Sequence, residues 1–188
     1  SMSNPGRYFS NNVTGSMLLV EALAHAGVDK IVFSSSASVY GTPAEVPVRE
    51  DAPLHPESVY AETKYMTERM LHWFSETHGM RSVSLRYFNA AGDSFDSLIG
   101  EDWSVTTNLV PVVMKATLGK RDALEVFGND YPTRDGTGIR DYIHVVDLAD
   151  AHVKALDYLA EGKPTIACNV GTGTGTTVLE VIQATERI

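Results

Sequence analysis

The chain has 188 residues, of which 43% are hydrophobic and 21% charged, and its formal net charge is -9. This composition is typical of a folded globular domain and argues against disorder and against a nucleic-acid surface. The sequence shows no signal peptide and no apolar run near the roughly 20 residues of a membrane span, and Cys168 is its only cysteine. We therefore expect a cytoplasmic protein with no membrane partner, no nucleic-acid partner and no intrachain disulfide.

Hydrophobic periodicity predicts helices and strands that alternate along the chain. The expected helices are residues 11–26, 58–74, 108–118 and 147–159, with a last helix opened by the capping-box signal of Thr177 and Glu180 and still running at Ile188. The expected strands are residues 30–33, 82–85, 123–127, 142–146 and 166–170. This alternation predicts an α/β fold with a doubly wound parallel sheet of the Rossmann type.

Several features are assigned to packing, turns or helix caps rather than to chemistry. Asn11 or Asn12, Asn108 and Asp147 are suited to cap their helices, and apolar residues of the second helix should form its buried face, namely Met66, Met70, Leu71, Trp73 and Phe74. The glycine-rich segment 171–175 lacks the third glycine of a dinucleotide fingerprint, so we interpret it as a turn. Cys168 is expected to be a small buried hydrophobe. The six histidines are scattered, and no metal site is predicted.

Hydroxyl side chains at the end of the first predicted strand form the main candidate site. Ser34, Ser35 and Ser36 lie at its carboxyl end, where open parallel sheets bind ligands. Tyr60 and Lys64 are four residues apart on the next helix and therefore share a face. An ammonium lowers the pKa of a neighbouring phenol from about 10, so Ser36, Tyr60 and Lys64 could move a proton on and off an alcohol. A Tyr-x-x-x-Lys spacing also arises by chance, so the pair alone is a weak signal.

Two further residues lie where ligands could bind. Asn89 follows the strand 82–85 at its carboxyl end, which favours ligand contact. Arg140 lies between a loop rich in turn residues, 128–138, and the strand 142–146, where a guanidinium suits recognition of phosphate groups. A surface ion pair between Arg140 and Asp141 is an equally good interpretation of the residues alone.

Five segments in order resemble the extended short-chain dehydrogenase/reductases, in particular the members that epimerise nucleotide sugars. They are residues 11–15 (Asn-Asn-Val-Thr-Gly), 33–41, 60–64 (Tyr-Ala-Glu-Thr-Lys), 85–89 and 127–145. The last segment is the most specific for those epimerases. The resemblance covers essentially the whole chain.

The resemblance implies reversible inversion at C4 of the hexose in UDP-glucose and UDP-galactose, with tightly held NAD. Tyr60 would be the base that takes the proton of the 4-hydroxyl, Lys64 would bind the nicotinamide ribose and help to hold Tyr60 toward phenolate, and Ser36 would hydrogen-bond the reacting oxygen. The implied cofactor ligands are Asn11, Ser34, Tyr60, Lys64 and Tyr87. The implied substrate ligands are Ser36, Asn89, Asn108, Leu109, Phe127 and Arg140, with Arg140 on the pyrophosphate.

The resemblance also implies how the chain is organised. Residues 1–90 would be the C-terminal part of an NAD-binding domain and residues 91–188 a region that binds the UDP-sugar, in a protein that forms homodimers. The first strand and glycine-rich phosphate loop of the family are expected before Ser1, and further substrate-binding structure after Ile188.

Two alternatives stay open at this point. A nucleotide-sugar 4,6-dehydratase is less favoured, because Ser36 is followed by Ala37, Ser38 and Val39 with no carboxylate. The other alternative is that this polypeptide is a catalytically silent fragment, because the expected pyrophosphate cradle is not part of it.

Overall fold

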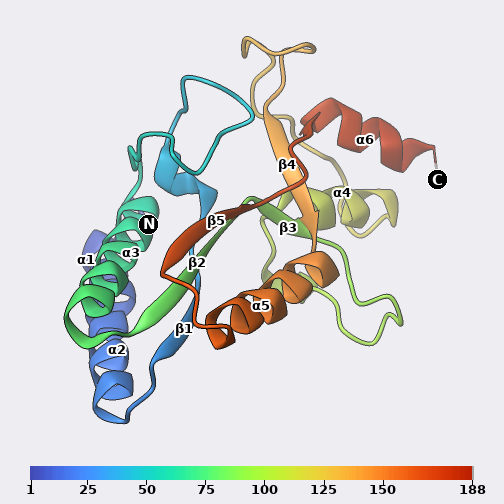
Figure 1. Cartoon of the computed structure of the whole chain (residues 1–188). Helices are drawn as coiled ribbons and strands as arrows, with labels where there is room; N and C mark the ends of the chain where they lie inside the picture. Colours follow the sequence, from blue (N-terminus) through green and yellow to red (C-terminus); the bar gives the residue numbers. More distant parts are fainter. Residues whose placement is uncertain (188) are drawn as a thin grey trace. The chain divides into compact units, whose positions relative to one another are not determined.

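The computed structural model of the chain describes residues 1–187 and has an α/β fold (Figure 1). The helices are α1 (Pro5–Tyr8), α2 (Gly15–His25), α3 (Val59–His78), α4 (Leu109–Thr117), α5 (Val145–Ala160) and α6 (Val178–Glu186), with a π-helical turn η1 (Phe9–Thr14) and two 3-10 turns, η2 (Ala37–Tyr40) and η3 (Trp103–Val105). The strands are β1 (Lys30–Ser34), β2 (Arg81–Tyr87), β3 (Asn89–Ala91), β4 (Ile139–His144), β5 (Ile166–Val170) and β6 (Gly175–Thr177). Ile188, where we expected the last helix to continue, lies outside the described residues.

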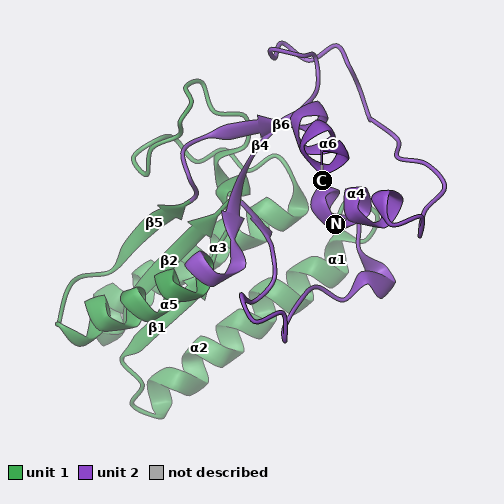
Figure 2. Cartoon of the chain, turned by 90° about the vertical axis from the view of Figure 1, so that its right-hand side faces the viewer, with its two compact units in different colours: residues 1–88, 148–170 green, residues 89–147, 171–188 purple. Residues whose placement is uncertain are grey.

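The elements form two compact units, coloured separately in Figure 2. Unit 1 consists of Ser1–Phe88 and Leu148–Val170, and unit 2 of Asn89–Asp147 and the described part of Gly171–Ile188. The chain thus leaves unit 1 after β2 and returns to it with α5 and β5. The assignment of cofactor binding to residues 1–90 and of UDP-sugar binding to residues 91–188 stays a prediction.

Unit 1 is built on a parallel sheet in the order β1-β2-β5. One face of the sheet packs Ile31 and Phe33 against a buried cluster from the helical layer of α2 and α3, which contains Val20 and Leu71. On the other face, Leu85 packs against Leu159 of α5 in a second core cluster. Helices therefore cover both faces of the sheet (Figure 1), as predicted for a doubly wound fold.

Unit 2 contains a second, three-stranded sheet in the order β3-β4-β6, in which β3 is parallel and β6 antiparallel to β4. Helices α4 and α6 pack against each other. The sequence was interpreted as a turn around Gly175, whereas Gly175 begins β6 and lies opposite Asp141 of β4. A Cβ atom at Gly175 would lie 2.4 Å from the Ile139 side chain. Glycine is therefore required here by close packing.

One expected strand is absent and two expected helix starts were wrong. Residues 123–127 do not form a strand, and Phe127 is 82% exposed. The first helical segment begins at Pro5, capped by Asn4, so Asn11 and Asn12 lie inside η1 and cap nothing. Helix α5 begins before Asp147, because the ring of His144 accepts a hydrogen bond from the backbone N–H of Val146 and occupies the position of a cap.

The expected buried face of α3 was only partly correct. Leu71 is buried, but Met66 and Trp73 are exposed at 36% and 56%. The cause is that α3 is apolar on more than the stripe that faces the sheet. The start of α3 was predicted correctly, and Ser58 is its N-cap. The predicted capping box of Thr177 and Glu180 is complete.

Candidate active site

The hydroxyl of Ser36 is fixed at the carboxyl end of β1. Ser36 has an extended backbone and caps η2, where its Oγ accepts hydrogen bonds from the Ser38 backbone N–H at 3.2 Å and from the Ser38 hydroxyl at 2.9 Å. Because both bonds use the oxygen as acceptor, the hydroxyl hydrogen of Ser36 stays available as a donor. The turn thus presents one O–H at the strand end.

Helix α3 places Tyr60 and Lys64 next to that strand end. The Lys64 ammonium donates to the backbone carbonyl of Ser34 at 2.8 Å, and its nitrogen lies 5.6 Å from the centre of the Tyr60 ring. It also lies 5.0 Å from the centre of the Phe33 ring. The structure therefore brings together Ser34, Tyr60 and Lys64, as expected from the sequence, and Ser36 lies close enough to Tyr60 to lower the pKa of its phenol.

Burial moves both titratable groups of this site toward their neutral forms. The pKa of Tyr60 is raised, first by burial and then by Tyr87, while the hydrogen bond from Ser36 acts in the opposite direction. Burial lowers the pKa of Lys64. The lower pKa of Tyr60 that we expected beside Lys64 is not found in this chain, because burial of the phenol dominates.

Two of the residues expected to line a cofactor, Ser34 and Asn11, are bonded to other side chains of unit 1. The Ser34 hydroxyl lies 3.2 Å from Nε2 of His152, whose Nδ1 lies 2.8 Å from the Leu148 carbonyl. Nδ1 therefore carries the proton and Nε2 accepts from Ser34. The exposed Asn11 donates to the Asn12 side chain at 2.9 Å.

Asn12 forms a contact with α3 that the sequence did not reveal, because we interpreted it as a helix cap. Its amide donates to the Thr63 hydroxyl at 3.1 Å and so ties η1 to α3. The π-helical form of η1, which only the structure reveals, indicates a functional segment, because such turns occur often at functional sites.

The sequence also did not reveal a buried polar network next to Ser36 in the chain. Ser35 donates to Oε1 of Glu68 at 2.5 Å, and Arg86 donates to both carboxylate oxygens of Glu68, with its shortest contact at 2.6 Å. Arg86 also donates to the Tyr40 hydroxyl at 2.8 Å. Burial opposes the charge of Arg86, but these partners outweigh it, so the pKa of Arg86 is raised.

Apart from Ser36, which is in unit 1, the residues expected to hold a UDP-sugar lie in unit 2. Asn89 donates to the carbonyl of Asp141 at 3.2 Å, which links β3 to β4. Leu109 is the first residue of α4, and Asn108 precedes it. Asn108 is the N-cap residue of α4, as predicted, but its side chain forms no capping hydrogen bond and lies 3.4 Å from the Glu101 carboxylate. Phe127 and Arg140 are both exposed.

Asp141 explains why residues 171–175 are not a phosphate cradle. Its carboxylate accepts hydrogen bonds from the backbone N–H groups of Thr172 at 2.9 Å and Gly173 at 2.8 Å. These N–H groups are therefore already paired. Within the described residues, Asp141 forms no ion pair with Arg140, which removes the alternative interpretation of that dipeptide.

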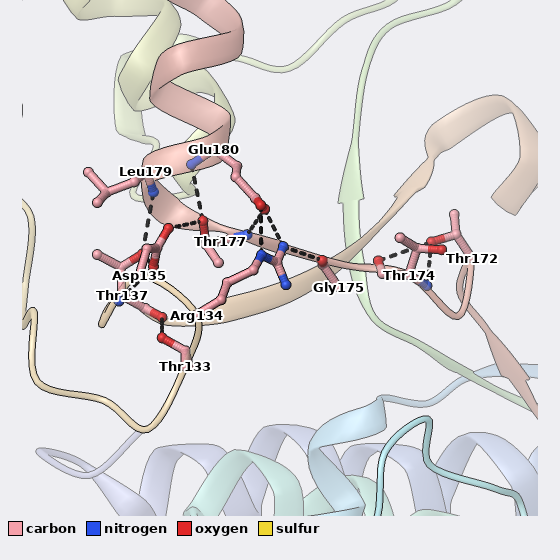
Figure 3. A network of polar contacts seen from close by, with 10 residues as sticks. All are labelled: Thr133, Arg134, Asp135, Thr137, Thr172, Thr174, Gly175, Thr177, Leu179 and Glu180. Carbon is pink, nitrogen blue, oxygen red and sulfur yellow. Dashed lines mark hydrogen bonds and ion pairs between the residues drawn. The ribbon is translucent and has the colours of Figure 1, made fainter.

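A polar network attaches the loop before β4 to the start of α6, as Figure 3 shows. Arg134 forms an ion pair with Glu180 and also donates to the Gly175 carbonyl at 2.8 Å. Asp135 accepts a hydrogen bond from the Thr177 hydroxyl at 2.5 Å. Arg134 lowers the pKa of Glu180 to about 2. The loop that leads into β4, and hence to Arg140, is thus anchored at two points.

Comparison with known proteins identifies the family. Residues 1–171 match the NAD dependent epimerase/dehydratase family. The chain belongs to this family. A UDP-glucose 4-epimerase of Lacticaseibacillus casei is 45% identical over the whole chain, which spans 57% of the length of that relative.

Solved structures of the family have the same fold as this chain. The UDP-glucose 4-epimerase from Brucella ovis, in complex with NAD, has a TM-score of 0.95 and 43% identity, and the match covers 98% of this chain and 57% of that one. The enzyme from Bifidobacterium longum, in complex with NAD+ and UDP, has a TM-score of 0.93 and 41% identity, with 100% and 56% covered. The comparisons confirm the resemblance and the fold predicted from the sequence.

For other kinds of site the structure gives two findings. In residues 1–187, no three His, Cys, Asp or Glu side chains are grouped so that they could hold a metal ion. None of the described helices has the length and apolar character needed to cross a bilayer.

Proposed function

We propose that the protein interconverts UDP-galactose and UDP-glucose by reversible oxidation and reduction at C4 of the hexose. The observation that carries this proposal is the convergence of Ser36, Tyr60 and Lys64 at one strand end in a chain of this family. The relatives named above add support as UDP-glucose 4-epimerases. The 4,6-dehydratase alternative has no such support, because the turn Ala37–Tyr40 that follows Ser36 carries no carboxylate.

We infer that NAD is the cofactor, and the donor set of unit 1 fits it. A ribose presents hydroxyl groups, and the candidate ligands Ser34, Lys64 and Tyr87 offer hydroxyl and ammonium donors near adjacent strand ends. Asn11, on η1, adds an amide. Tyr60 completes the proposed cofactor contacts. NAD, when bound, supplies the hydride acceptor and donor.

Tyr60 would handle the proton of the C4 oxygen. Because burial raises its pKa, the phenol in this chain favours its protonated form, which can donate to an oxygen that gains charge. Removing a proton from the 4-hydroxyl requires the phenolate, so the opposite direction needs additional positive charge at the site. On substrate binding, Ser36 would turn its one hydroxyl hydrogen from Tyr60 to the same oxygen, because its contacts with Ser38 use Oγ only as an acceptor.

Unit 2 would hold the nucleotide part of the substrate. We assign Arg140 to the pyrophosphate, because its guanidinium is exposed and Asp141 is engaged elsewhere. Asn89, Asn108, Leu109 and Phe127 would supply the remaining contacts, together with Ser36 at the sugar. Strong binding of the nucleotide leaves the sugar loosely held, as a reaction on both faces of C4 requires.

We further propose that the protein acts as a homodimer in the cytoplasm. Apolar side chains are exposed on α2 and α3, including Leu18 at 62% and Trp73 at 56%. Met17, Met66 and Trp73 line a shallow pocket on these helices. Exposed apolar surface of this kind marks interaction sites. A single cysteine suits a reducing compartment.

The activity is tested by following the conversion of UDP-galactose to UDP-glucose by this 188-residue chain with NAD supplied. We expect NAD-dependent turnover that falls by about 10²–10⁴-fold in Tyr60→Phe, the range for a positioned acid or base. Tyr131→Phe, which removes an exposed hydroxyl in unit 2, is the matched control and should retain activity. Absence of turnover in the unmodified chain would contradict the proposal for this polypeptide and favour the silent-fragment alternative.

A further inference from the structure

Ser35 lies between two residues of the candidate site but points away from it. Its side chain is fully buried, at 0% exposure, and its hydroxyl donates to Glu68 at 2.5 Å. Glu68 follows Lys64 by four residues on α3, so Tyr60, Lys64 and Glu68 recur at helical spacing along one side of the helix. The helix that carries Tyr60 is therefore bonded directly to the residue next to Ser36.

Arg86 holds Glu68 in one orientation. Its Nε lies 3.0 Å from one carboxylate oxygen of Glu68 and its Nη2 lies 2.6 Å from the other, in a pair whose side chains are only 6% and 9% exposed. Such bidentate, charge-assisted pairs have a narrow geometry. The remaining fork of Arg86 donates to the Tyr40 hydroxyl at 2.8 Å.

The contact of Glu68 with Ser35 and the contact of Arg86 with Tyr40 lie on either side of the turn that fixes Ser36. Ser35 precedes Ser36, and Tyr40 is the last residue of the turn η2 that Ser36 caps. Tyr40 is itself fixed, because its hydroxyl donates to Asn169 at 2.8 Å. The network therefore forms hydrogen bonds to both ends of the turn that contains Ser36, and these bonds join the turn to α3 and β2.

We propose that Glu68 is a positioning residue, which sets the place of the Ser36 hydroxyl relative to the Tyr60 phenol through Ser35, Arg86 and Tyr40. The importance of Glu68 for catalysis rests on the function proposed above. A displacement of about 1 Å in a reacting group can cost about 10²-fold in rate, so a rigid buried connection between helix and strand end is what this chemistry requires. Glu68 itself touches no substrate in this scheme.

The proposal is tested by Ser35→Ala, which removes the hydroxyl link and leaves the ion pair of Glu68 and Arg86 in place. The matched control is Ser82→Ala, since Ser82 is also fully buried in unit 1 and its hydroxyl has no hydrogen-bond partner among the described residues. Circular dichroism verifies that both variants are folded. If Ser35→Ala does not fold, the Tyr60 titration is measured instead in Tyr40→Phe, which removes the hydrogen bond between Tyr40 and Arg86.

The readout is the titration of the Tyr60 phenol, followed by carbon-13 NMR of tyrosine-labelled chain and assigned by the signal missing in Tyr60→Phe. The Ser36 hydrogen bond lowers the pKa of Tyr60, so loosening Ser36 should move the Tyr60 titration to higher pH in Ser35→Ala but not in Ser82→Ala. A Tyr60 titration that coincides in Ser35→Ala and in the unmodified chain overturns the proposal. This measurement needs no turnover, so its outcome is independent of whether the proposed reaction is correct.

A kinetic readout separates positioning from substrate binding. Where the unmodified chain turns over UDP-galactose, Ser35→Ala should lower kcat by about 10- to 100-fold, the effect of a misplaced reacting group, and leave KM unchanged. A change in KM alone contradicts the assignment, because Ser35 would then act on binding rather than on the reacting atoms.

Discussion

Tyr60 and Lys64 share a half-buried space in which charge is disfavoured. Burial raises the pKa of the phenol and lowers that of the ammonium. Because both changes act against charge, the protonation state of the pair should respond strongly to any ligand that brings charge to the strand end. Such sensitivity suits a group that must take up a proton in one direction of a reaction and release it in the other.

Glu180 is the residue whose ionisation should govern the acid stability of unit 2. Its pKa is lowered to about 2, first by Arg134, against about 4.3 for an unfolded glutamate. A carboxyl with a depressed folded pKa stabilises the fold above its unfolded pKa, and this contribution is lost as the pH falls toward the folded pKa. We therefore expect Glu180→Gln to be less stable than the parent at neutral pH, with the difference disappearing between about pH 4.3 and pH 2.

Thermal unfolding followed by circular dichroism across this pH range measures the effect. The matched control is Glu125→Gln, an exposed carboxylate in a loop of the same unit. Its unfolding curves should follow those of the parent at every pH. A Glu180→Gln variant whose deficit persists unchanged at about pH 2 would show that the side chain acts by packing rather than by its charge.

Helical spacing revealed some site residues and concealed others. The shared face of Tyr60 and Lys64 follows from a period of four, and the structure confirms it. The bond from Lys64 to the Ser34 carbonyl does not follow, because no sequence pattern states where a backbone oxygen points. Asn12 looked like a cap, since an amide near a helix start is normally one; only the earlier start at Pro5 turns it toward Thr63.

A buried ion pair joins helix α3 to strand β2 and stabilises the packing of the helix on the sheet. The side chains of Arg86 and Glu68 are 6% and 9% exposed. Removing one partner of a buried pair leaves the other charge without compensation, which costs about 3–5 kcal/mol. We expect Glu68→Gln to lower the free energy of unfolding by about this amount, measured from the midpoint of urea denaturation.

Glu76→Gln is the control for the loss of a carboxylate from the same helix. Glu76 is exposed on α3, so its replacement should change the free energy of unfolding by less than about 0.5 kcal/mol. Combining Glu68→Gln with Arg86→Met removes both charges and should recover part of the loss. Equal urea midpoints for Glu68→Gln and Glu76→Gln would contradict a stabilising role of the pair.

At the scale of elements, hydrophobic periodicity predicted the strands whose side chains are buried on one face or on both faces of the sheet. The strands of unit 1 were found because their apolar runs are covered on both faces. Residues 123–127 were also predicted as a strand, yet they form none and pair with no strand of the described chain, and Glu125 interrupts their apolar run. The three-residue strand β6 is too short to carry a periodic signal, and its glycine indicated a turn.

Over the whole molecule, chain order and spatial order differ. The segment Leu148–Val170 belongs to unit 1 although residues of unit 2 precede and follow it. A sequence divides naturally into consecutive pieces, whereas a parallel sheet can recruit a strand from any distance along the chain because its connections are crossovers. Strand β5 pairs with β2 in this way, and Cys168 lies opposite Leu85.

The proposed homodimer makes a prediction for the whole molecule. A stable interface buries about 800 Å² on each partner around a cluster of apolar anchors, and Trp73, 56% exposed on α3, is the largest apolar side chain in the candidate surface. We expect the chain to sediment as a dimer and Trp73→Glu to weaken the dimer by at least about tenfold, because a buried carboxylate without a partner opposes association. Leu156→Glu, at a site on α5 that is 53% exposed, should sediment like the parent. A parent that stays monomeric at every concentration, or equal dissociation constants for the two variants, would leave this face of α2 and α3 without a role in association.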